Sequence, residues 1–123
     1  MIKNINALDC FKILKENKKA KLIDVRTAKE WWDDGYPDLT AINKHVYFIT
    51  RDNSNFADDV IERGFNKDDI LFFICRSGVR SFYAISDLIN HFNMDNMFNV
   101  DGGIEQGWKI AGLQIKYLSL IHI

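Results

Sequence analysis

Four short segments of strand composition are spaced along the chain, and stretches with helical periodicity separate them. The segments are 21–25, 45–49, 70–74 and 97–100, each of strand length. Segment 70–74 reads Ile-Leu-Phe-Phe-Ile without any alternation, which is typical of a strand covered on both faces of a parallel sheet. Strands that alternate with helices predict an α/β fold with a mainly parallel sheet.

Capping residues and apolar spacing predict the helices. The first helix begins at Asn6, with Asp9 in a loose capping box, and it ends near residue 17. Thr27 can cap a brief helix over 28–32. A third helix is expected after a cap at Asn53 or Ser54; it carries Phe56, Val60 and Ile61 and ends at Gly64. A fourth begins near Val79, and its apolar face consists of Phe82, Ile85, Leu88, Ile89 and Phe92. A turn at 101–103 then leads into a short helix with Ile104 and Trp108.

The composition is that of a globular protein. The 123 residues are 47% hydrophobic and 27% charged, with a formal net charge of -1, so we expect one domain over residues 1–123. No basic excess points to nucleic acid or to an anionic membrane surface. No segment is long and apolar enough for a membrane span or a signal-peptide core, so we expect a cytoplasmic protein.

The two cysteines stand in different sequence surroundings. Cys10 lies at helical spacing with Ala7, Phe11 and Leu14, so we expect a small buried hydrophobe rather than a disulfide partner. Cys75 directly follows the strand 70–74 and precedes a helix. Ligands of open parallel sheets bind outside the carboxyl ends of the strands, which makes Cys75 the candidate reactive residue.

The segment Cys75-Arg76-Ser77-Gly78-Val79-Arg80 has the composition of an anion-binding loop. A tight turn between a strand and a helix directs backbone N–H groups inward, and Gly78 permits the angles that such a turn needs. The helix N-terminus and the two arginines add positive charge, which favours a thiolate. A buried cysteine beside solvated arginines is the competing interpretation, and the residues alone leave both open.

Three separated motifs give the chain a resemblance to the rhodanese-like family of single-domain sulfurtransferases. They occur in the family's order over about residues 5 to 115, and an apolar tail, 116–123, extends past them. The motifs are Leu22-Ile23-Asp24-Val25-Arg26, the loop Cys75–Arg80, and Val100-Asp101-Gly102-Gly103-Ile104 followed by Trp108. The resemblance implies a three-layer α/β/α fold with a five-stranded, mainly parallel sheet.

The resemblance also implies a reaction. Cys75 would take the outer sulfur of a small anionic donor such as thiosulfate and pass it from a persulfide to a thiol or another thiophilic acceptor, with ping-pong kinetics. Asp24 and Arg26, at a neighbouring strand end, would support the loop as a structural ion pair or a hydrogen-bonding group rather than take part in the chemistry. The donor-binding residues would be Arg76, Ser77, Gly78, Val79 and Arg80. No cofactor or metal is expected, and the histidines at 45, 91 and 122 show no metal-ligand spacing.

Other functions remain open at this point. A phosphatase or arsenate reductase on this fold would need an arginine at position 81, which is Ser81, so Arg80 comes one residue early. The domain could instead be a sulfur carrier or regulatory binding module that a protein partner loads. Redox sensing is disfavoured, because no second cysteine lies near Cys75 in the sequence. The segment 33–44 departs from the family pattern and receives no site residue. The apolar tail could pack on its own domain, or it could cover a partner or a second copy of the chain.

Overall fold

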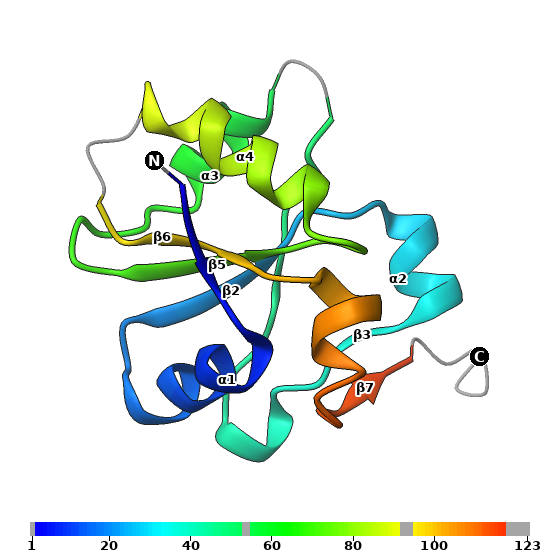
Figure 1. Ribbon diagram of the computed structural model, residues 1–123. Helices are drawn as coiled ribbons and strands as arrows, with labels where there is room; N and C mark the ends of the chain where they lie inside the picture. The colour runs from blue at the N-terminus through cyan, green and yellow to red at the C-terminus, as the bar shows by residue number, and fades with distance from the viewer. Residues whose placement is uncertain (1, 53–54, 92–94, 118–123) are drawn as a thin grey trace.

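A parallel sheet between two layers of helices forms the protein (Figure 1). The computed structural model describes residues 2–52, 55–91 and 95–117. The sheet order is β1-β6-β5-β2-β4, and every neighbouring pair is parallel, which confirms the predicted fold class. The strands are β1 (Lys3–Ile5), β2 (Ala20–Asp24), β4 (Tyr47–Phe48), β5 (Ile70–Ile74) and β6 (Met97–Val100).

Each face of the sheet builds its own apolar core. Helices α3 (Phe56–Glu62) and α4 (Val79–Ile89) cover one face, while α1 (Ala7–Glu16) and the π-helical turn η2 (Gly103–Trp108) cover the other (Figure 1). Along β5, Leu71 and Phe73 enter the first core, and Phe72 and Ile74 enter the second. Burial on both faces explains why this strand is apolar without alternation.

Two predicted helix starts have the expected caps. The Asn6 side chain accepts a hydrogen bond from the Asp9 backbone N–H at 2.8 Å and caps α1. Helix α2 (Ala28–Asp34) begins with a full capping box between Thr27 and Glu30. The predicted caps of α3 at positions 53 and 54 lie outside the described residues, and Asn55, which precedes that helix, makes no side-chain cap hydrogen bond.

Several boundaries differ from the expectation. Strand β1 had no sequence signal, since its Lys3 and Asn4 are polar, and it forms by pairing with β6. Only two residues of the expected strand 45–49 pair with β2. In α4, Phe82 and Ile89 are exposed, because the covered face consists of Ser81, Ala84, Ile85 and Leu88. Position 92, expected on that helix, lies outside the described residues.

The segment 33–44 is placed by a partner from the other end of the chain. Strand β3 (Tyr36–Pro37) pairs antiparallel with β7 (Ile115–Lys116), and the turn η1 (Thr40–Ile42) follows. A Cβ on Gly35 would lie 2.6 Å from Ile115 Cγ2, so a glycine is needed for this approach. The tail 116–123 therefore begins within β7, and residues 118–123 lie outside the described part. No helix among the described residues is long and apolar enough to cross a membrane.

Candidate active site

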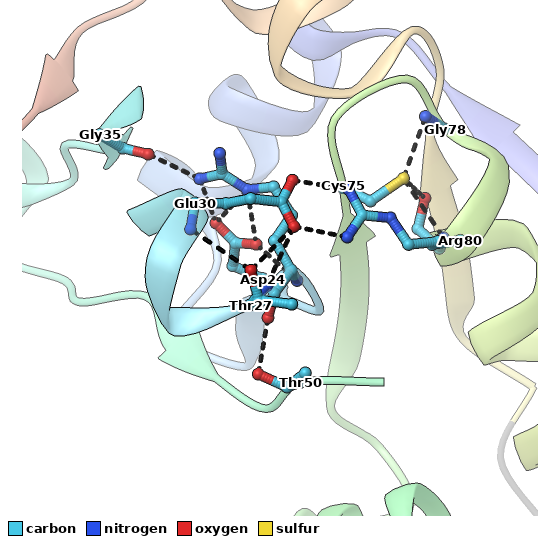
Figure 2. Close-up of polar contacts among 10 residues, drawn as sticks. Asp24, Thr27, Glu30, Gly35, Thr50, Cys75, Gly78 and Arg80 are labelled. Atoms are coloured by element: carbon cyan, nitrogen blue, oxygen red, sulfur yellow. Dashed lines mark hydrogen bonds and ion pairs between the residues drawn. The ribbon is translucent and has the colours of Figure 1, made fainter. Parts of the chain in front are cut away.

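The sulfur of Cys75 is turned toward the first turn of α4. Cys75 follows β5, and Gly78, with φ of 99°, is the cap residue of α4. The Gly78 N–H donates to Sγ at 3.1 Å and the Ser81 N–H donates at 3.4 Å (Figure 2). These donors and the positive end of the helix can hold negative charge on the sulfur.

Apart from these donors and the Ser81 hydroxyl, the surroundings of that sulfur are apolar. Cys75 is fully buried and packs in the α3–α4 core with Val25 and Ala84. Cys10 is also fully buried, on α1 in the other core, as expected, and burial raises the pKa of its thiol. Both cysteines are free. The backbone donors of the loop therefore distinguish Cys75 from Cys10, because burial is common to both.

The two arginines of the loop do not surround the sulfur. Arg76 is exposed to solvent. Arg80 donates from Nη1 and Nη2 to the two carboxylate oxygens of Glu30 at 2.6 and 2.7 Å (Figure 2). Among the hydrogen bonds of the described residues, none joins either guanidinium to Cys75 Sγ. The sulfur therefore lies in a cup of backbone N–H groups, and the charge of Arg80 is compensated by the Glu30 carboxylate.

The Arg80–Glu30 pair changes the titration of both groups. The hydrogen bond from Arg80 is the main cause that lowers the pKa of Glu30 to about 2. The same bond raises the pKa of Arg80. Glu30 is also the capping-box residue of α2, so one carboxylate serves a helix start and the loop arginine. The sequence contained this residue in the pattern Thr27-x-x-Glu30, but nothing in the pattern linked it to Arg80.

Asp24 and Arg26 form a buried ion pair at the carboxyl end of β2. Arg26 Nε and Nη2 donate to the Asp24 carboxylate at 3.0 and 2.8 Å, and both side chains are at most 1% exposed. Arg26 Nη2 also donates to the Gly35 carbonyl at 2.7 Å, and the Thr50 hydroxyl donates to the Arg26 carbonyl at 2.6 Å (Figure 2). The pair therefore connects three segments, which follow β2, α2 and β4. They lie at the same end of the sheet as Cys75.

The Gly102-Gly103 motif holds the loop from the η2 side. The Ile104 N–H donates to the Cys75 carbonyl at 2.8 Å, and the Glu105 N–H donates to the Arg76 carbonyl at 3.0 Å. A Cβ on Gly103, where φ is 58°, would lie 2.3 Å from the Cys75 carbonyl oxygen. The motif that carried part of the resemblance therefore has a direct structural role at Cys75.

A polar pair under the loop was missed in the sequence. The Ser81 hydroxyl lies 3.3 Å from Cys75 Sγ and donates to Asn99 Oδ1. Both side chains are buried, Ser81 on α4 and Asn99 on β6. A signal was present, because Ser81 is a polar residue on the apolar face with Ala84, Ile85 and Leu88. The side chains of the remaining loop residues, Ser77 and Val79, are exposed.

A cavity lined by several lysines lies away from Cys75. It measures about 530 Å³ at the amino end of β2, and its lining includes Lys15, Lys18, Lys44 and His45. Lys44 donates there to the carbonyls of Asn17 and Ala20, and burial lowers its pKa. In the ranges that the structure describes, no group of three or more His, Cys, Asp or Glu residues could hold a metal ion.

Known proteins of similar sequence cover nearly the whole chain. Residues 8–110 match the family model of the rhodanese-like domain. An uncharacterized protein of Rickettsia prowazekii is 36% identical over 115 residues, which are 89% of this chain and 93% of that protein. These two matches concern the sequence and span the three motifs described above.

Solved structures share the fold. The crystal structure of a protein from M. tuberculosis superposes with a TM-score of 0.82 at 27% identity, covering 93% of this chain and 96% of that chain. The solution structure of a polysulfide-sulfur transferase homodimer from Wolinella succinogenes superposes with a TM-score of 0.77 at 24% identity, covering 99% of this chain and 83% of that chain. By its sequence match and its fold, this chain belongs to the rhodanese-like domain family.

Proposed function

We propose that this protein is a sulfurtransferase that carries a sulfane sulfur on Cys75 as a persulfide. The observation behind the proposal is the direction of the Gly78 and Ser81 N–H groups, which donate to the Cys75 sulfur at the start of α4. Backbone donors that already point at the reacting atom can stabilise its charge without reorganisation. Membership of the rhodanese-like family and the similarity to a polysulfide-sulfur transferase support the same chemistry.

The reaction consists of two balanced half-reactions. The Cys75 thiolate attacks the outer sulfur of thiosulfate, a new S–S bond forms, and the donor's own S–S bond breaks so that sulfite leaves with its electron pair. The acceptor thiolate, or cyanide in an assay, then attacks the outer sulfur of the persulfide, and Cys75 leaves as the thiolate. The Gly78 and Ser81 N–H groups would hold negative charge on the sulfur in both steps.

Donor binding is assigned to the mouth of the loop. Arg76 is exposed there and can meet an anionic donor, while Ser77, Gly78 and Val79 supply the backbone of the turn. Arg80 donates two of its five N–H groups to Glu30, which leaves donors for a substrate oxygen. The acceptor is a thiol, either a small molecule or a cysteine of another protein.

Steady-state kinetics test this assignment. With thiosulfate and cyanide both varied, the wild-type protein should give the parallel double-reciprocal lines of a ping-pong mechanism. Cys75→Ser should have no turnover, since a hydroxyl cannot carry the sulfur, and the buried Cys10→Ala is the matched control that keeps turnover. Undiminished turnover in Cys75→Ser would refute the role of Cys75.

A sulfur carrier or regulatory module that a protein partner loads is the second candidate. Two observations favour it: Cys75 is fully buried, and Glu30 compensates the charge of Arg80. Both weaken the capture of a free dianion, whereas a docking protein could deliver sulfur directly. Loading by a cysteine desulfurase with cysteine, compared with loading by thiosulfate, separates the two. The carrier predicts fast loading by the desulfurase and negligible turnover of thiosulfate.

A further inference from the structure

The orientation of Asn99 is determined by a backbone carbonyl. Asn99 Nδ2 lies 3.1 Å from the Gly78 carbonyl oxygen, which can only accept, and it also donates to Asn4 Oδ1 at 3.0 Å. The other amide atom, Oδ1, therefore faces Ser81 and must accept. The single hydroxyl proton of Ser81 is consequently donated to Asn99.

The direction of that hydrogen bond decides what Ser81 offers to the sulfur. With its proton used on Asn99, Ser81 Oγ presents only lone pairs to Cys75 Sγ at 3.3 Å. A thiol can donate its S–H to those lone pairs, whereas a thiolate would face them without a donor. The contact therefore favours the thiol, in opposition to the Gly78 and Ser81 N–H groups, which favour negative charge.

We propose that Asn99 is a positioning residue that turns the Ser81 hydroxyl proton away from Cys75 Sγ, so that only the backbone N–H groups donate to the sulfur. The inference rests on the proposed function, because Cys75 is the nucleophile there. On ionisation the sulfur's proton passes to a base in solution, and the hydroxyl turns from Asn99 Oδ1 to the sulfur. The O–H···O bond breaks and an O–H···S⁻ bond forms, so Asn99 opposes the charged state.

Other charged groups near the loop come from several elements. Arg80 of α4 pairs with Glu30 of α2. The Asp24–Arg26 pair follows β2, Arg76 belongs to the loop, and Glu105 of η2 donates its N–H to the Arg76 carbonyl. None of these groups contacts the Ser81 hydroxyl in the described hydrogen bonds. Substitutions at 81 and 99 therefore leave this charge set unchanged when the new side chain is neutral.

Alkylation of Cys75 by iodoacetamide over a range of pH tests the inference in a Cys10→Ala background, with no sulfur donor present. Asn99→Leu keeps the size of the side chain and removes the acceptor, so the Ser81 hydroxyl can donate to the thiolate. The pH at which alkylation is half-maximal should fall by about one unit. At pH values well below this midpoint, the variant should then contain about ten times more thiolate than the parent protein. The pH midpoint of the thiolate's ultraviolet absorbance should shift by the same amount as the alkylation midpoint. Because the absorbance measurement uses no reagent, it excludes an effect of reagent access.

The double variant identifies the route of the effect. In a Ser81→Ala background, Asn99→Leu should leave the midpoint where Ser81→Ala alone puts it. An equal shift of the midpoint in both backgrounds would overturn the inference, because Asn99 would then act through the Gly78 carbonyl. An unchanged or raised midpoint in Asn99→Leu alone would also overturn it. If Asn99→Leu does not fold, Asn99→Ala replaces it: alanine is also neutral and also lacks the acceptor, so the midpoint should fall, and an unchanged or raised midpoint overturns the inference.

The same variants separate this inference from the proposed function. A shifted alkylation profile in protein that never gains sulfur from thiosulfate or from a desulfurase would support the role of Asn99 and refute sulfur transfer. Sulfur loading in wild type, combined with an unshifted profile in Asn99→Leu, would refute the role of Asn99 alone.

Discussion

Arg80 and Glu30 form a two-pronged ion pair, with nitrogen–oxygen distances of 2.6 and 2.7 Å, between residues fifty positions apart. The pair joins the first turn of α4 to the first turn of α2 beside Cys75 (Figure 2). Parallel N–H···O bonds of this kind restrict both planar groups. The pair therefore positions the loop arginine and at the same time compensates its charge.

Glu30→Gln should strengthen the binding of an anionic donor. Glutamine keeps the size and one acceptor oxygen, but it leaves the charge of Arg80 uncompensated. We expect the KM for thiosulfate to fall several-fold, and the free energy of unfolding in urea to fall by about 1 kcal/mol, since the pair is partly exposed. Asp33→Asn, at the exposed Lys29–Asp33 pair of the same helix, is the control and should change neither value. A higher KM in Glu30→Gln would mean that Glu30 is needed to orient Arg80 for the donor.

The same pair predicts a loss of stability in acid. The pKa of Glu30 is lowered in the folded protein to about 2 from an ordinary value of 4.5, so the folded state binds the proton less well than the unfolded state. The stabilisation is complete above about pH 4.5 and is lost as the pH falls toward 2. The difference in unfolding free energy between wild type and Glu30→Gln should therefore shrink between about pH 6 and about pH 3. A difference that is constant over this range would contradict the assigned cause.

Gly103→Ala should damage the loop far more than a glycine substitution elsewhere. Both Gly103 and Gly112 have positive φ, but a Cβ at 103 meets the Cys75 carbonyl oxygen at 2.3 Å, whereas at 112 nothing lies within 4 Å. We expect Gly112→Ala to cost about 1 to 2 kcal/mol from the backbone alone. Gly103→Ala should cost about 1 to 3 kcal/mol more and should also reduce alkylation or loading of Cys75. Equal losses in urea unfolding would show that the close approach has no energetic effect.

Asp24→Asn should be among the most destabilising polar substitutions in the chain. It leaves the buried Arg26 guanidinium without its charge partner, which costs about 3 to 5 kcal/mol in proteins. Asp87→Asn, which breaks the half-exposed pair with Arg51, should cost about 1 kcal/mol or less. Denaturant unfolding of both variants measures the contrast. Similar losses for the two would mean that Asp24 is solvated or replaceable.

Local patterns were enough to predict the position of Cys75. A run of five apolar residues indicates a strand covered on both faces, and the glycine three residues after Cys75 permits the turn into α4. The cap at Asn6 and the start of α2 at Thr27 could be predicted for the same reason, since each depends on neighbours within four residues. Such features follow from short-range geometry.

Contacts between distant segments could not be predicted. The Arg80–Glu30 pair depends on how α2 docks beside α4, and β1 becomes a strand only because β6 provides an edge for its polar residues. Gly103 approaches Cys75 closely because β5 and β6, which precede these two residues, are neighbours in the sheet. The need of Asn99 for polar partners, in contrast, could have been inferred from the sequence, because an amide in the covered strand Met97–Val100 must form hydrogen bonds. In the structure these partners lie under the loop.

Intact-mass spectrometry after exposure to a sulfane sulfur donor is the most direct measurement of whether Cys75 carries transferable sulfur. Wild type and Cys10→Ala should each gain the mass of one sulfur atom from thiosulfate or from a cysteine desulfurase, and cyanide should remove it. Cys75→Ser, folded by circular dichroism, should gain nothing. Sulfur that is retained by Cys75→Ser, or a wild-type protein that gains none from either donor, would contradict a persulfide on Cys75.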